Sequence, residues 1–186
     1  MESSIANIAN YKATEDWWYI FPGILVVEVL IIIIVRFFPK TFGEPINDWY
    51  DEFGLSAVLS DIMIIAISIA ITRYIYTNYF MEQEGWSIFY FIGLAIVIQI
   101  VHDVIFAYGI VNKIPKGHNS VIDLFKIYIA GGPKILGADA VMVAGSIGLA
   151  AYLKTVDYHY ITSVSFVALY TLSYILYTNI NLKSAA

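Results

Sequence analysis

The sequence contains no cysteine and few charged residues. The absence of cysteine excludes structural disulfides, thiol redox chemistry, c-type haem attachment and metal sites with cysteine ligands. Charged residues make up 13% of the 186 residues, whereas an ordinary soluble domain has about 25%. The formal net charge is −5, so the chain lacks the basic surface with which proteins bind nucleic acid. We therefore expect no nucleic-acid partner.

Recognisable catalytic motifs are also missing. The sequence has no HExxH, no GxSxG and no Walker loop, which are the short signatures of zinc proteases, serine hydrolases and nucleotide-binding loops. No lysine lies in the middle of an apolar run, which disfavours a retinal-type Schiff base. Glu15 and Asp16 precede the first run, where a secretory signal would be basic. We expect no signal peptide, no catalytic, cofactor or metal site, and no enzyme.

What the sequence does have is long apolar runs. Apolar residues make up 60% of the chain and the mean hydropathy is +0.74. A helix needs about 20 apolar residues to cross the hydrocarbon of a bilayer. Five stretches have this length: residues 17–38, 56–77, 86–111, 135–153 and 158–179. The sequence therefore predicts an all-α integral membrane protein with five transmembrane helices in one membrane domain, residues 1–186.

Basic residues near the ends of these runs predict the orientation, because lysine and arginine are enriched on the cytoplasmic side. One side has three of them: Lys12, Arg73 and Lys154. The other side has seven: Arg36, Lys40, Lys113, Lys116, Lys126, Lys134 and Lys183. We expect the N-terminus outside and the C-terminus in the cytosol. Aromatic anchors are expected outside at Trp17, Trp18 and Trp86, and inside at Trp49 and Tyr50.

Two of the runs share a pattern around an aspartate. Ser, Tyr and Thr follow Asp61 at offsets of 7, 13 and 16, and they follow Asp139 at the same offsets. The resemblance extends upstream, where "INDWYDEF" and "VIDLFKIY" each place apolar residues at i, i+3, i+4 and i+7. That spacing indicates an amphipathic helix, which beside a membrane span lies in the interface. We interpret residues 45–111 and 119–180 as a duplicated hairpin, and 17–38 as a lone first span that serves for lateral contact.

Ionisable residues inside the runs are the candidates for a functional site. Asp61, Asp103 and Asp139 each lie near the cytoplasmic end of a run, His102 adjoins Asp103, and Glu28 lies near the middle of the first run. Such groups cost at least about 2.5–3.5 kcal/mol each to insert, and a function is the default explanation. The first three should share a depth. With His102, this layer could bind protons or hold a cation.

A structural role for the same residues is the alternative interpretation. Asp61 and Asp139 could cap the starts of their helices. Lys113, Lys116 and Lys134 could pair with them, and His102 with Asp103 could bond a neighbouring helix. Small residues between 144 and 151 give the fourth run a face suited to close helix packing.

One segment resembles a known group of proteins. "VHDVIFAYGIV" followed by "IPKGHNSVIDLFKIYIAGGPKILGADAVMVAGSIGLAAYL" is similar to small multi-span membrane proteins of nucleocytoplasmic large DNA viruses. These have a P-K-G-x-N loop, then I-D-L-F-K-x-Y, then a span that carries an aspartate. The resemblance implies a structural protein of the virion inner membrane, beneath an icosahedral capsid. Its partners would be other virion membrane or capsid proteins, or further copies of itself.

Three functions follow from these observations. The first is an architectural membrane protein of a large DNA virus that anchors the internal membrane to the capsid layer. Its contacts with partners or lipid would be Trp49, Tyr50 and four lysines: Lys113, Lys116, Lys126 and Lys134. The second is a proton- or cation-handling transporter or channel that uses the intramembrane Asp/His layer. The third is a membrane-embedded enzyme.

Overall fold

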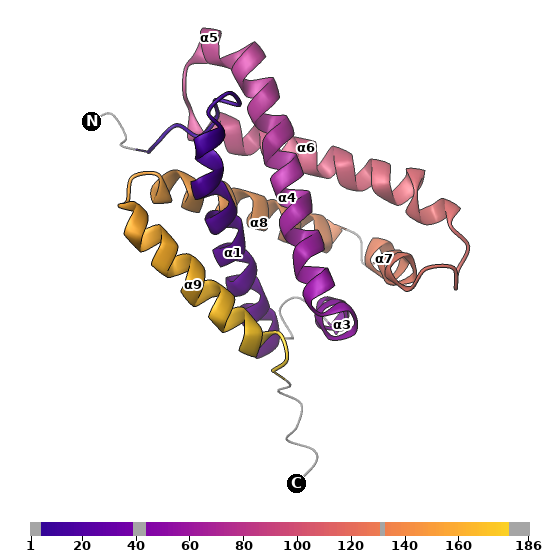
Figure 1. Ribbon diagram of the computed structural model, residues 1–186. Helices are drawn as coiled ribbons and strands as arrows, with labels where there is room; N and C mark the ends of the chain where they lie inside the picture. The colour runs from indigo at the N-terminus through magenta and orange to yellow at the C-terminus, as the bar shows by residue number, and fades with distance from the viewer. Residues whose placement is uncertain (1–4, 39–43, 131–132, 179–186) are drawn as a thin grey trace.

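The computed structural model describes residues 5–38, 44–130 and 133–178, and all regular structure in these ranges is helical (Figure 1). The long helices are α1 (Trp17–Phe37), α4 (Leu55–Ile75), α6 (Ile88–Gly109), α8 (Pro133–Leu153) and α9 (Tyr158–Ile175). Two shorter helices, α3 (Glu44–Phe53) and α7 (Ser120–Ala130), precede α4 and α8. The predicted all-α fold is confirmed, and each long apolar run forms a helix.

Four of the described helices are long and apolar enough to cross a bilayer. These are the helical stretches that contain α1, α4, α6 and α8, and they support an integral membrane protein. The fifth run, α9, is less apolar because tyrosine, serine and threonine recur along "YHYITSVSFVALYTLSYI". A fifth crossing therefore stays a prediction.

Local sequence signals account for several helix boundaries. Gly54, between α3 and α4, has φ +52°, a backbone conformation that costs other residues a steric penalty. It lets the chain turn sharply, so α3 packs against α4. Asn119 Oδ1 accepts a hydrogen bond from Ile122 N at 3.2 Å, and Asp157 Oδ1 accepts one from His159 N at 2.9 Å. These side chains satisfy backbone donors at the starts of α7 and α9.

The expected loop at residues 78–85 is wrong. The chain continues from α4 through a π-helical turn (Tyr76–Phe80) into α5 (Met81–Glu84), and it ends at Gly85, which has φ +66°. Tyr76 explains this extension. Its ring is buried against Trp86 and Phe91, and its hydroxyl lies 2.9 Å from the Gly85 carbonyl oxygen. The buried ring holds the extension against α6, which polar residue composition alone does not indicate.

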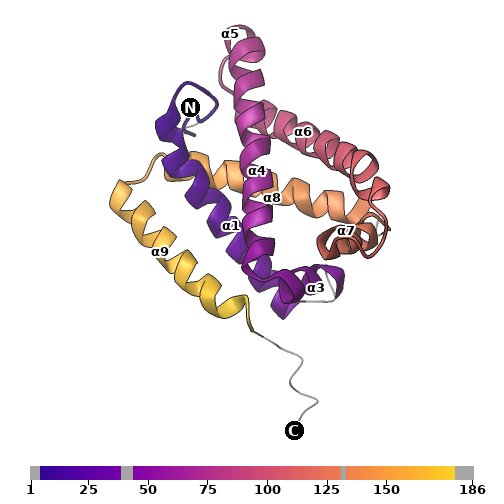
Figure 2. The same cartoon turned by 45° about the vertical axis from the view of Figure 1, so that its right-hand side comes forward.

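The helix α1 lies at the centre of the molecule, so the expectation of a lateral first span is wrong. It packs against α8, α9 and α4, and α9 flanks it on the side away from α6 (Figures 1 and 2). A Cβ added at Gly23 would lie 3.0 Å from both Ala150 N and Ser146 O. The backbones of α1 and α8 therefore touch along the small-residue face of α8, which packs as its composition indicates.

Buried ion pairs tie the helices together at both ends of the molecule. At the end that contains the start of α1, Asp16 is fully buried and pairs with Arg73, at 3.1 Å, and with Lys154. At the other end, Arg36 pairs with Asp51 at 2.6 Å and donates to the Leu176 carbonyl oxygen at 2.6 Å. The starts and ends of α1, α4, α8 and α9 are thus linked in an antiparallel arrangement.

Candidate functional site

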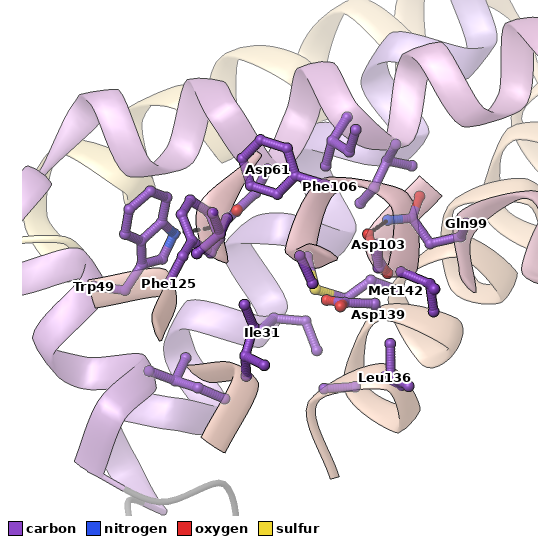
Figure 3. Close-up of a pocket in the computed structure, with 18 of the residues that line it drawn as sticks. Ile31, Trp49, Asp61, Gln99, Asp103, Phe106, Phe125, Leu136, Asp139 and Met142 are labelled. Carbon is purple, nitrogen blue, oxygen red and sulfur yellow. Dashed lines mark hydrogen bonds between the residues drawn. The ribbon is translucent and has the colours of Figure 1, made fainter. Parts of the chain in front are cut away.

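A pocket of about 380 Å³ brings the predicted carboxylates together. Asp61 on α4, Asp103 on α6 and Asp139 on α8 all line it, with α3 and α7 supplying further walls (Figure 3). Because the three aspartates come from three separate helices, only the packing of the bundle brings them to one pocket. Most of the remaining wall is apolar or aromatic.

The interpretation of Asp61 and Asp139 as helix caps is wrong. The helix α4 begins at Leu55 and α8 begins at Pro133, so each aspartate is the seventh residue of its helix. Backbone N–H groups at that depth are already bonded within the helix, because only the first four lack an intrahelical partner. Neither carboxylate therefore caps its own helix, and each needs another explanation.

Asp61 is held by the two aromatic residues of α3. Trp49 Nε1 donates a hydrogen bond to Asp61 Oδ2 at 3.0 Å, and the Tyr50 hydroxyl lies 3.2 Å from the same oxygen. Trp49 and Tyr50 are 5% and 2% exposed. Their predicted role as contacts with lipid or partners is therefore wrong for this structure. The apolar stripe of α3 faces the bundle, and it carries both residues inward.

Tyr50 also connects the pocket to a buried acid. Its hydroxyl lies 3.0 Å from Glu28 Oε1, and Glu28 is 0% exposed and lies behind the pocket wall. The other oxygen of Glu28, Oε2, is buried without a hydrogen-bond partner. Burial raises the pKa of the Tyr50 hydroxyl well above its usual range, and the neighbouring Glu28 and Asp61 carboxyls raise it further. Tyr50 thus remains a neutral hydroxyl between two acids.

Asp103 takes part in a second polar group on α6. Gln99 Nε2 donates to Asp103 Oδ1 at 2.9 Å, and His102 Nδ1 lies 3.1 Å from the same oxygen. The His102 ring stacks on Phe106 and does not line the pocket. Gln99, which we did not predict as a site residue, does line the pocket and is 3% exposed. Its signal in the sequence is a single amide one helical turn before Asp103, within an apolar run.

Two acceptor atoms in this group have no partner. Gln99 Oε1 and Asp103 Oδ2 are both buried and unbonded. Buried polar atoms in folded proteins are nearly always hydrogen-bonded, and each exception calls for an explanation. Because Gln99 Nε2 already bonds the carboxylate, the amide oxygen is directed away from it and cannot exchange places with the nitrogen without losing that bond.

Asp139 accepts no hydrogen bond and forms no ion pair within the described part of the chain. It lies close enough to Asp103 and Asp61 to be repelled by both. The predicted lysine partners lie elsewhere: Lys113 and Lys116 are exposed, while Lys126 donates to the Ile114 carbonyl oxygen and lies 3.9 Å from Asp123. The side chain of Lys134 lies outside the described residues. The pocket carboxylates are therefore not neutralised by the described lysines.

The chemistry of the pocket is that of an acceptor-rich site. Its carboxylates, together with the free amide oxygen of Gln99, attract protons and cations. Among residues 5–38, 44–130 and 133–178, no three side chains of His, Asp or Glu are grouped closely enough to hold a metal ion. In comparisons with protein families, curated proteins and solved structures, the chain matches none of them.

Proposed function

We propose that the chain is a proton-handling integral membrane protein, in which Glu28, Tyr50 and Asp61 form the proton-binding group. The observation that carries this proposal is one hydroxyl placed between two carboxyl groups. The Tyr50 oxygen lies 3.0 Å from Glu28 Oε1 and 3.2 Å from Asp61 Oδ2. The long apolar helices around this group place it within the membrane-spanning part of the protein.

Counting protons shows what this geometry requires. A tyrosine hydroxyl has one proton to donate, and ionised carboxylates only accept. Two short contacts to two ionised acids would leave one pair of acceptors facing each other. One carboxyl must therefore hold a proton and donate it to the Tyr50 oxygen, while Tyr50 donates its own proton to the other acid.

The surroundings of the two acids assign the proton to Glu28. Asp61 already accepts a hydrogen bond from Trp49 Nε1 and faces the pocket, so its negative charge is partly compensated. Glu28 is fully buried, and its second oxygen has no donor. A buried, unpaired carboxylate costs far more than a neutral carboxylic acid in the same place. The resting arrangement is thus neutral Glu28, neutral Tyr50 and ionised Asp61.

Proton transfer through this group is balanced at each step. Glu28 gives its proton to the Tyr50 oxygen as Tyr50 gives its hydroxyl proton to Asp61 Oδ2. Tyr50 is unchanged at the end, Glu28 becomes the carboxylate and Asp61 becomes the acid, which exchanges its proton with the pocket. The high pKa of Tyr50 means that it relays protons without persisting as an anion.

The test is proton flux in liposomes that carry an internal pH-sensitive dye. We expect the wild-type chain to dissipate an imposed pH gradient faster than protein-free liposomes. We expect Glu28→Gln and Tyr50→Phe to slow this by at least about tenfold, a loss equivalent to about 1.4 kcal/mol. Glu52→Gln is the matched control, since Glu52 is an exposed acid on the same helix as Tyr50. Equal flux in all four proteins, or none in the wild type, overturns the proposal.

Infrared spectroscopy tests the protonation state separately. The wild type should show the carbonyl band of a protonated carboxylic acid at neutral pH, and Glu28→Gln should lose it. Retention of this band in Glu28→Gln, with its loss in Asp61→Asn, would place the proton on Asp61 instead and contradict the assignment.

The architectural role in a virion membrane is our second proposal. The observation that favours it is the clamping of both ends of the bundle by buried ion pairs, Asp16 with Arg73 and Arg36 with Asp51, which suits a rigid component. The exposed Lys113 and Lys116 would contact capsid proteins or lipid headgroups on the cytoplasmic side. Quantitative mass spectrometry of purified particles tests this role. Hundreds of copies per particle support it, and absence from particles overturns it.

A further inference from the structure

The pocket has a second part, beyond the Tyr50 group, in which three acceptors have no donor. These are Gln99 Oε1, Asp103 Oδ2 and the Asp139 carboxylate. Gln99 is 3% exposed, so bulk water does not reach its amide freely. Figure 3 shows Gln99, Asp103 and Asp139 together on one side of the pocket, with Trp49 and Asp61 on the other.

The sequence pattern explains why the Asp139 side differs from the Asp61 side. In the alignment of the two amphipathic segments, Leu124 and Phe125 take the places of Trp49 and Tyr50. Leucine and phenylalanine have no hydrogen-bond donor. Asp61 therefore has two donors from the short helix before it, whereas Asp139 has none from its own.

The missing donors define the chemistry of a ligand. A group that satisfies two carboxylates and an amide oxygen must supply several N–H or O–H donors, and it must be cationic to balance the charge. A primary ammonium has three donors and one positive charge. The aromatic rings of Phe106 and Phe125 line the same pocket and favour a cation near their faces.

The size and lining of the pocket indicate that the cation carries an apolar body. The volume is about 380 Å³, which falls in the usual range for organic ligands of roughly 300–1,000 Å³ and far exceeds a bare ion. No metal-binding group occurs among the described side chains. The rest of the wall is aliphatic, with Ile31, Ile64, Val104, Leu136 and Met142 among its residues.

We propose that this pocket binds an amphiphilic primary amine, with its ammonium group on Asp139, Asp103 and Gln99 and its hydrocarbon along the aliphatic wall. The ammonium would come either from a free long-chain amine or from the headgroup of an aminophospholipid. This site is distinct from the proton-binding group, because neither Glu28 nor Tyr50 supplies a free acceptor to it.

The experiment measures binding of dodecylamine to the full chain in phosphatidylcholine nanodiscs, with dodecanol as the neutral analogue of equal length. We expect dodecylamine to bind and to raise the unfolding temperature, and dodecanol to do neither. Asp139→Asn should weaken dodecylamine binding by at least about tenfold, because it removes a charge-assisted contact. Asp48→Asn, at an exposed acid outside the pocket, should bind like the wild type.

Two further arms separate the alternatives. Competition by nanodiscs that contain phosphatidylethanolamine identifies a lipid headgroup as the source of the ammonium, and its absence identifies a free amine. Tyr50→Phe should keep dodecylamine binding while it loses proton flux, so the two proposals can fail independently. Equal binding of dodecanol, or unchanged dodecylamine binding in Asp139→Asn that folds normally, overturns the amine site.

Discussion

Asp16 and Arg73 form a fully buried ion pair, with Asp16 Oδ2 3.1 Å from Arg73 Nη2, across 57 residues of sequence. The Arg73 guanidinium also donates to the carbonyl oxygens of Asn10 and Ala13 and lies 5.4 Å from the Trp17 ring. The pair therefore joins the segment before α1 to the end of α4. Two buried charges are tolerated here because each has several partners.

Removal of the Asp16 charge should strongly destabilise the protein. Asp16→Asn leaves Arg73 buried without its counter-ion and also removes the partner of Lys154. Breaking a buried pair in this way costs about 3–5 kcal/mol. Denaturation in detergent micelles measures the change, with Glu82→Gln, at an exposed acid on the same end of the molecule, as the control. A loss below about 1 kcal/mol, the value typical of exposed pairs, would contradict the proposed role of this pair.

The close contact of α1 and α8 predicts a difference between two glycines. Gly23→Ala places a methyl group 3.0 Å from the backbone of α8, so the helices must separate, at a cost of about 1–3 kcal/mol. Gly148→Ala adds a methyl group that meets nothing within 4 Å and should be neutral or slightly stabilising. Thermal unfolding of the two variants measures the difference, and equal midpoints would show that the α1–α8 contact is looser than described.

Alkaline pH should destabilise the protein partly through Tyr50. Its pKa in the folded protein is raised by burial and by the two neighbouring acids, whereas in the unfolded chain it is about 10. The stability that neutral Tyr50 provides is therefore complete below about pH 10 and is lost as the pH rises towards the folded value. Denaturation midpoints between about pH 8 and pH 11 measure this loss.

Two variants isolate the contribution of Tyr50 to this alkaline loss. Tyr50→Phe is less stable than the wild type at neutral pH but should lose less stability above about pH 10. Tyr177→Phe, at a tyrosine that is 74% exposed, should follow the wild-type curve. A Tyr50→Phe curve parallel to that of the wild type would show that the hydroxyl ionises as easily in the folded state.

The cysteine-free sequence allows a direct test of orientation. Single cysteines at Thr155 and Lys116, both exposed, should react with a membrane-impermeant thiol reagent from opposite sides of the membrane. If α9 crosses, a cysteine at Tyr177 should label from the same side as Lys116→Cys. Labelling of Tyr177→Cys from the Thr155 side would mean that α9 lies along the surface and that only four helices cross.

The helices themselves could be predicted from the sequence with good accuracy. Each apolar run was expected within a few residues of a long helix, because bilayer thickness and backbone hydrogen bonding leave few other solutions for such runs. The aspartates were also predicted as a layer, since charged residues within apolar runs are conspicuous. Local patterns failed at Trp49 and Tyr50. An amphipathic stripe shows that one face is apolar, but it does not show whether that face meets lipid or the bundle.

What the sequence alone determined was the all-α architecture, the positions of the long helices and the residue types available for a polar layer. Only the tertiary structure decided which of these groups meet. Tyr50 joins Glu28 to Asp61, Asp16 joins Arg73 to Lys154, and Asp139 is left without a donor. These relationships depend on how separate helices cross and rotate against each other. Helix packing is set by contacts between residues far apart in the chain, which the periodicity of a single helix does not encode.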